Sequence, residues 1–481
     1  MAYTVAQNTS FLTIASILQK VISFFYFIFV ARMINVENTG VYFFAISFTT
    51  IFTVVADFGM GPVLTRETAR FPDRAPQYFN TVFWTKIMFG FAAYALIILC
   101  VNVLNYPVNT KLLIYLSGIT MFFDNLTTSF NSIFRAKKNL MFESITIIAA
   151  QFTTLVIGTL ALLSHWPLFW LIIAYTIPSF LTVIYMAVAL KKVYAITIRF
   201  IWNSRVFKIF LATALPFALA GIIGRLYSYS DSLLMSKMLT AKELGWWSVP
   251  YKITFAFQFI PVALSASVYP VFSGLFLTDK TAIASLFEKS WRYLFAIIFP
   301  LAFGLIAIAD PVIRHIFGAQ YEPSITAMRI LLVSLIFGFL ALITGALLNG
   351  TNKQKIQTSL ISVALALNIG LNLWLLPEFG INGAAISALV SNMLLCIAGF
   401  YFSLRQVPIQ VKNILVSLQQ TLWPAVGMGI VVYLLSFKIH YLVTIVVGGT
   451  MYIGLLYYTQ VINKELIVTV MEKIKLKKRV V

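Results

Sequence analysis

The sequence aligns with itself, without a gap, at Ile14-Ala15-Ser16-Ile17-Leu18-Gln19-Lys20-Val21-Ile22-Ser23-Phe24 and Leu219-Ala220-Gly221-Ile222-Ile223-Gly224-Arg225-Leu226-Tyr227-Ser228-Tyr229. The same offset of 205 residues places Met33 on Met238 and Gly40 on Gly245. The match therefore runs through one apolar helix, its end and the start of the next helix. An internal repeat of this length predicts two lobes of similar architecture.

A basic side chain lies near the middle of each copy, Lys20 in the first and Arg225 in the second. A Lys or Arg at the centre of a membrane helix costs about 2.5 to 3.5 kcal/mol, so such residues usually face a cavity. We expect the two cations to face one another across a water-filled cavity between the lobes, where they would bind an anionic group. The alternative is a pair of packing helices whose cations pair with acids or reach the interface.

The composition is that of a membrane protein. Of the 481 residues, 60% are hydrophobic and only 10% are charged, which leaves too little polar surface for a soluble globule. The net charge of +20 comes from basic residues in short loops between apolar runs, so it indicates membrane topology and excludes a nucleic-acid-binding patch. No metal-ligand cluster, cofactor motif or nucleophile motif is present, and we expect neither a metal, a cofactor nor an enzyme activity.

Apolar runs of about 20 residues predict an all-α polytopic protein with about fourteen transmembrane helices. Equivalent helices lie six apart, so the two lobes form a parallel repeat around an axis along the membrane normal. The sequence predicts a first lobe at 1–190, an amphipathic surface connector at 191–208, a second lobe at 209–404, and two further helices with a basic tail at 405–481.

The distribution of loop charges predicts the orientation of the chain. Most basic residues, including Arg66, Lys86, Arg135, those of the connector and those of the tail from Lys464 to Arg479, lie on one side of the predicted helices. The positive-inside rule places that side, and both termini, in the cytoplasm.

Three carboxylates fall within the predicted helices and are candidates for coupling to protons or sodium, Asp231, Asp57 and Asp124. Asp231 is favoured because it follows Arg225 on the same helix by six residues, about 9 Å along the axis. The alternative for the other two is structural pairing, of Asp57 with Arg66 and of Asp124 with Arg135.

A candidate hinge precedes and adjoins the second cation. Pro216 removes a backbone hydrogen bond, and Gly221 and Gly224 follow it. This pattern favours bending of the helix beside Arg225.

Three further segments resemble polysaccharide flippases of the O-antigen (Wzx) type: Val55-Ala56-Asp57-Phe58-Gly59-Met60, Phe317-Gly318-Ala319-Gln320-Tyr321, and Asn368 to Asn372 with Pro377 to Ala385. This family belongs to the multidrug, oligosaccharidyl-lipid and polysaccharide exporter superfamily, which also contains lipid II flippases and drug exporters of the MATE kind. The resemblance covers nearly the whole chain and implies two lobes that rock about a central cavity.

The resemblance also implies a function. Such proteins move an oligosaccharide on undecaprenyl diphosphate from the cytoplasmic to the outer leaflet of the cell inner membrane during O-antigen and lipopolysaccharide biosynthesis, alongside the polysaccharide polymerase machinery. Basic residues such as Lys20 and Arg225 suit a diphosphate and would repel a cationic drug. The alternatives are a MATE-like ion-coupled drug exporter, a lipid II flippase, and a receptor-like or channel protein without a transport cycle.

Overall fold

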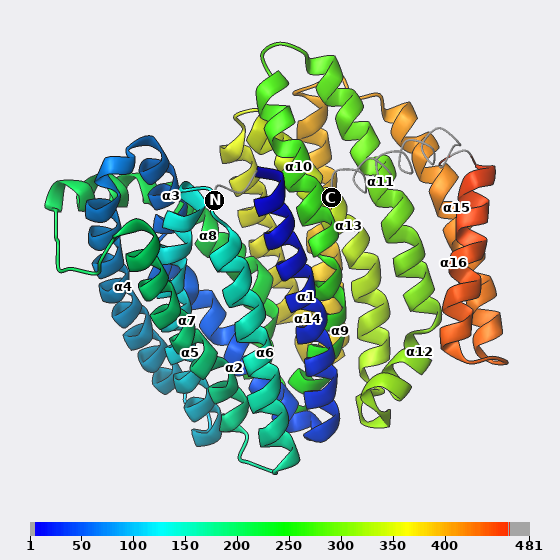
Figure 1. Cartoon of the computed structure of the whole chain (residues 1–481). Helices are drawn as coiled ribbons and strands as arrows, with labels where there is room; N and C mark the ends of the chain where they lie inside the picture. Colours follow the sequence, from blue (N-terminus) through cyan, green and yellow to red (C-terminus); the bar gives the residue numbers. More distant parts are fainter. Residues whose placement is uncertain (1–4, 460, 462–481) are drawn as a thin grey trace. The chain divides into compact units, whose positions relative to one another are not determined.

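The computed structural model describes residues 5–459 and 461, and every regular element in them is a helix. The predicted all-α class is confirmed. Figure 1 shows the helices in chain order, coloured from blue to red. By their contacts they form two compact units, Met1–Ser248 and Val249–Val481.

In the described residues the first unit is built from eight α-helices, one short 3-10 helix and the start of a ninth α-helix. Their bounds are α1 Val5–Met33, α2 Val36–Asp57, α3 Met60–Arg70, η1 Pro72–Arg74, α4 Ala75–Val103, α5 Val108–Ala136, α6 Met141–Leu163, α7 Phe169–Tyr194, α8 Ser204–Met238 and the beginning of α9 Ala241–Phe257. The helix α8 packs against α2, α3 and α4, so the first unit extends beyond the predicted connector. The division into lobes at 191–208 stays a prediction.

In the described residues the second unit continues with the end of α9 and nine further helical elements, of which three are short. Their bounds are α10 Phe259–Leu275, α11 Lys280–Ala307, α12 Ala309–Val312, η2 Ile313–Phe317, η3 Ala319–Tyr321, α13 Ser324–Gly350, α14 Gln354–Leu404, α15 Val411–Ser436 and α16 Tyr441–Tyr458. The 51-residue α14 has non-helical backbone angles at Gly380, which divides it into two crossings.

Within the described residues, 12 helical segments are long and apolar enough to cross a membrane. The amphipathic α5 is of spanning length as well, and α14 contains two crossings. The predicted number of about fourteen is thereby confirmed. The basic tail of the prediction, Lys464 to Arg479, lies outside the described residues.

The helix boundaries follow the internal repeat. The first helix of each copy ends at Met33 or Met238, and the next begins at Val36 or Ala241, so both boundaries keep the offset of 205 residues. The two new helices are also capped by side chains at equivalent positions. Asn35 Oδ1 accepts from Asn38 N at 2.7 Å, and Thr240 forms a reciprocal pair with Glu243.

Two repeat-related glycines hold the starts of α2 and α9 together. A Cβ on Gly40 would lie 1.9 Å from the Ala241 carbonyl oxygen, and a Cβ on Gly245 would lie 2.0 Å from the Val36 carbonyl oxygen. These neighbours are backbone atoms and cannot rotate away. Close helix approach through small residues is a general feature of membrane helix packing.

We therefore expect Gly40→Ala and Gly245→Ala each to lower the free energy of unfolding by about 1 to 3 kcal/mol, the usual cost of overpacking. The matched control is Gly449→Ala in α16, where an added Cβ meets no atom within 4 Å. Thermal unfolding of the purified variants in detergent measures the difference. Equal midpoints for all three proteins would contradict the close contact.

The connector is not the surface helix that the sequence predicts. The helix α7 ends with Ala195 in the left-handed region, and residues 196–203 are non-helical; they form the long green trace at the left of Figure 1. The physical reason is that side chains of α4 take up the backbone groups of this segment. Asn80 bonds both Thr197 O and Arg199 N, and Trp84 Nε1 donates to Arg199 O at 2.9 Å.

The second membrane-spanning segment, Val36–Arg70, is a broken helix. The break falls at Phe58 and Gly59, which both have positive φ, between α2 and α3. Gly59 is required for space as well, because a Cβ there would lie 2.9 Å from the Ala214 carbonyl oxygen of α8. The break leaves Asp57 at the end of α2, beside the first turn of α3. The positive end of the α3 helix dipole stabilises a negative charge at this position.

Candidate functional site

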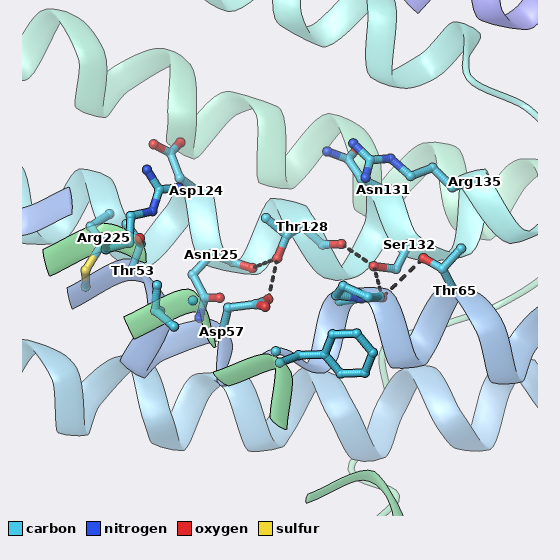
Figure 2. A pocket seen from close by; sticks show the side chains of 17 residues that line it. Thr53, Asp57, Thr65, Asp124, Asn125, Thr128, Asn131, Ser132, Arg135 and Arg225 are labelled. Carbon is cyan, nitrogen blue, oxygen red and sulfur yellow. Dashed lines mark hydrogen bonds between the residues drawn. The ribbon is translucent and has the colours of Figure 1, made fainter. Parts of the chain in front are cut away.

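A cavity of about 800 Å³ lies inside the first unit. Its walls come from the end of α2, the start of α3, the second half of α5 and the middle of α8. Of the residues predicted from the sequence, Arg225, Asp57, Asp124 and Gly221 line it. Figure 2 shows that Arg225 and Asp124 lie at one end and Arg135 at the other.

One face of α5 forms the longest wall. Asp124, Thr128, Asn131 and Arg135 recur at helical spacing and all line the cavity. Figure 2 shows them in this order along the helix. A polar face of this length needs a wet or protein-lined environment inside a membrane.

A buried ion pair anchors the break in the second span. Lys86 on α4 is fully buried, and its Nζ lies 2.5 Å from Asp57 Oδ1 and 2.5 Å from Thr128 Oγ1. Thr128 also donates to Asn125 O at 2.7 Å, so the cluster joins α2, α4 and α5. The Asp57 carboxylate keeps partial exposure and lines the cavity. A charge pair of this depth holds its geometry because either charge alone would be costly.

Arg225 projects from α8 into the cavity as an exposed side chain. Among residues 5–459 and 461 it has no hydrogen-bond or ion-pair partner. Asp124, at the same end, accepts a hydrogen bond from Ser179 Oγ at 2.6 Å. An exposed guanidinium without a protein partner can offer its donors to an anion that enters the cavity.

The alternative interpretation of Asp57 and Asp124 was structural pairing; Asp57 is paired in this way, but the partners that the alternative named are wrong. Arg66 pairs with Glu67 at 2.8 Å, and Arg135 pairs with the buried Glu143 across the turn between α5 and α6. The partner of Asp57 is Lys86, which the charge distribution had assigned to a cytoplasmic loop. Lys86 lies within a long apolar stretch of the sequence, and that position was the signal for a buried charge.

The remaining predicted residues lie elsewhere in the first unit. Lys20 is half-buried near the middle of α1, and Asp231 is buried on α8, six residues beyond Arg225. Neither residue lines the cavity. The helix α8 is continuous through Pro216, and the space beside Gly224 is open. The pairing of Lys20 with Arg225 and the hinge stay predictions.

The fold is shared with known membrane transporters. The lipid II flippase MurJ, in an inward closed conformation, aligns with 94% of this chain and 99% of its own at a TM-score of 0.77 and 17% identity. An inward-facing MATE family multidrug transporter of the MOP superfamily aligns with 81% of this chain and 94% of its own at a TM-score of 0.68 and 15% identity. The chain is thus a multi-pass helical membrane protein with a MurJ- and MATE-like fold.

A family model described as "Polysaccharide biosynthesis protein" matches residues 5–276, and the chain belongs to this family. A relative in Shigella flexneri, named "Putative O-antigen transporter", is 25% identical over 169 residues. That alignment covers 35% of this chain and 40% of the relative. The predicted membership of the polysaccharide exporter group is confirmed.

Proposed function

We propose that this protein is a flippase for lipid-linked oligosaccharides, which moves undecaprenyl-diphosphate-linked O-antigen or polysaccharide repeat units from the cytoplasmic to the outer leaflet by alternating access. In this proposal the chain lies in the cell inner membrane with both termini in the cytoplasm. It delivers its cargo to the polysaccharide polymerase machinery and couples transport to protons or sodium.

The observation that carries the proposal is the exposed Arg225 in a polar cavity of a membrane-spanning unit. A diphosphate must leave water to cross the bilayer, and it needs a charge-assisted partner at that depth. Arg225 offers a planar guanidinium suited to phosphate oxygens. Lys20, at the equivalent position of the repeat, is the proposed second cation.

The MATE-like alternative fits the cavity less well. A cationic drug needs an available carboxylate, but Asp57 is already neutralised by the buried Lys86. The other carboxylate that lines the cavity is Asp124. Within residues 5–459 and 461 it has no cationic partner within 4.0 Å, and it lies at the same end of the cavity as Arg225. A positive charge beside the site would oppose binding of a cation.

The direct test is transport by the purified protein in liposomes. Wild-type protein should flip a fluorescent polyprenyl-diphosphate oligosaccharide, measured by the loss of protection from a reagent added outside. The same vesicles should not accumulate ethidium. Ethidium transport without lipid movement would favour the drug exporter, and movement restricted to lipid II would favour the lipid II flippase.

Asp231 is the proposed coupling residue, because it is buried on α8 near Arg225. A cation that binds Asp231 would weaken its attraction for Arg225, and the membrane potential supplies about 2.3 kcal/mol per charge per 100 mV for this step. We expect Asp231→Asn to flip lipid at a rate that no longer depends on an imposed proton or sodium gradient. Transport is measured in the same liposomes with and without the gradient. If dependence on the gradient is unchanged, Asp231 is structural, and Asp124 and Asp57 are the remaining candidates.

A further inference from the structure

The hydroxyl groups of the cavity wall donate their protons to backbone carbonyl oxygens. Thr53 Oγ1 donates to Thr50 O at 2.7 Å, Thr65 Oγ1 donates to Gly61 O at 3.1 Å, and Ser132 Oγ donates to Thr128 O at 2.8 Å. Figure 2 shows the Thr65 and Ser132 side chains turned to the same stretch of α3 backbone. Each oxygen still has lone pairs, so toward the cavity these residues act as hydrogen-bond acceptors.

Two planar side chains of α5, a carboxylate and an amide, add further hydrogen-bonding groups. Asp124 accepts one hydrogen bond, from Ser179, and a carboxylate can accept several more. The Asn131 amide lines the cavity, and its Oδ1 is buried with no hydrogen-bond partner in the part of the chain that the structure describes. A buried acceptor without a donor is costly, and rotation of the Asn131 amide about its last torsion brings this oxygen to the cavity, where a ligand donor removes the cost.

The two arginines stand at opposite ends of this acceptor wall. Asp124, at the Arg225 end, and Arg135 are 11 residues apart on α5, which corresponds to about 16 Å at the helical rise. Arg225 has no partner in the part of the chain that the structure describes, whereas Arg135 is held by Glu143. The anionic part of a ligand therefore has its place beside Arg225, and the donor-bearing part has its place along the acceptors that run from Asp124 toward Arg135.

We propose that this wall, formed by Thr53, Thr65, Asp124, Asn131 and Ser132, is the saccharide subsite of the flippase. The inference rests on the proposed function and adds the position and the chemical preference of the sugar. Of these five side chains only the Asn131 amide offers a phosphate group a donor, whereas sugar hydroxyl and acetamido N–H groups can donate to an oxygen of each one. The exposed ring of Phe217 on α8 lines the same cavity and offers an apolar surface to the C–H face of a sugar ring.

The acceptor wall also gives the subsite a specificity. A neutral or N-acetylated sugar can donate to Asp124 and Asn131, whereas the carboxylate of a uronic acid brings a second negative charge to an acceptor wall. Like charges at this depth repel strongly because the dielectric is low. The subsite therefore selects neutral sugars, and Asp124 is its specificity-determining residue.

The test uses the full-length purified protein in nanodiscs and three soluble short-chain probes. These are citronellyl diphosphate, the same diphosphate carrying galactosyl-N-acetylglucosamine, and the same diphosphate carrying glucuronosyl-N-acetylglucosamine. Affinities are measured by calorimetry for wild type, Asn131→Leu, Asp124→Asn and Arg225→Ala. The control is Thr127→Val on the same helix, because the Thr127 hydroxyl bonds its own backbone and does not line the cavity.

Wild type should bind the neutral saccharide probe about tenfold or more tightly than citronellyl diphosphate, as expected for one or two added hydrogen bonds to buried acceptors. Asn131→Leu should lose this increment and keep its affinity for citronellyl diphosphate, and Thr127→Val should match wild type. Asp124→Asn should gain affinity for the glucuronosyl probe.

Two results would overturn the subsite while leaving the flippase intact. One is equal affinity for the saccharide and diphosphate probes in wild type, with both lost in Arg225→Ala. The other is a combination of two observations. Asn131→Leu would still bind the neutral saccharide probe more tightly than citronellyl diphosphate, and Asp124→Asn would prefer the same sugar as wild type. Binding of none of the probes would overturn the proposed function and the subsite together. Tight binding of tetraphenylphosphonium that is lost in Asp124→Asn would assign the acceptors to organic cations and also reject the subsite.

Discussion

Replacing Lys86 by Met should lower the free energy of unfolding by about 3 to 5 kcal/mol, the usual cost of leaving one charge of a buried pair without its partner. The Lys86 side chain has no exposed surface, and its removal leaves the Asp57 carboxylate without a cation beside the break between α2 and α3. The same change removes the bond from Lys86 to Thr128, so α4 and α5 also lose one of the hydrogen bonds between them. Reversible unfolding in mixed detergent micelles measures the effect.

Two comparisons make this result specific to the ion pair. The double variant Lys86→Met with Asp57→Asn should recover most of the loss, because it removes both charges together. Arg66→Met removes the exposed cation that pairs with Glu67 and should cost less than about 1 kcal/mol. A Lys86→Met protein as stable as Arg66→Met would contradict the burial and the pairing of Lys86.

Arg225→Ala should reduce flipping of a diphosphate-linked oligosaccharide by about tenfold to a hundredfold. This range corresponds to the 1.5 to 3 kcal/mol that a hydrogen bond to a charged group contributes. Arg225→Lys should retain part of the activity, because an ammonium keeps the charge but loses the planar donor pair. The measurement is the initial rate in liposomes at matched protein content.

The equivalent residue of the repeat provides a parallel series. Lys20→Ala should be impaired to a similar extent, and Lys20→Arg should be tolerated better because it keeps the cation. Thr127→Val on α5 serves as the control, since the Thr127 hydroxyl donates to Phe123 O of the same helix. Full activity of Arg225→Ala at normal protein levels would show that transport does not require the Arg225 cation.

Much of the helix pattern could be predicted from the sequence, because it depends on local signals. The internal repeat, with its offset of 205 residues, also predicts that the helices of Lys20 and Arg225 end at equivalent positions. They do so, at Met33 in α1 and Met238 in α8. Capping residues at the two equivalent positions explain why the next helices begin where they do. Apolar length then defined the spans without knowledge of their packing.

The features that the sequence did not predict depend on tertiary contacts. The amphipathic pattern of the connector indicated a helix, but Asn80 and Trp84 of α4 bind its backbone and favour an extended course. The partner of Asp57 could not be inferred from sequence spacing, because Lys86 reaches it from another helix. The cavity itself arises from the break at Gly59 and the packing of α8 against it, neither of which has a periodic signal.

The most direct test of the central claim is to locate the cargo on the protein. An undecaprenyl-diphosphate disaccharide with a photoreactive group on the sugar is irradiated in nanodiscs with the wild-type chain, and the labelled residues are mapped by mass spectrometry. The cavity predicts labels within residues 53–65 of α2 and α3, 121–135 of α5 and 217–225 of α8, and weaker labelling in Arg225→Ala. Labels confined to other helices, unchanged in Arg225→Ala, would contradict the account.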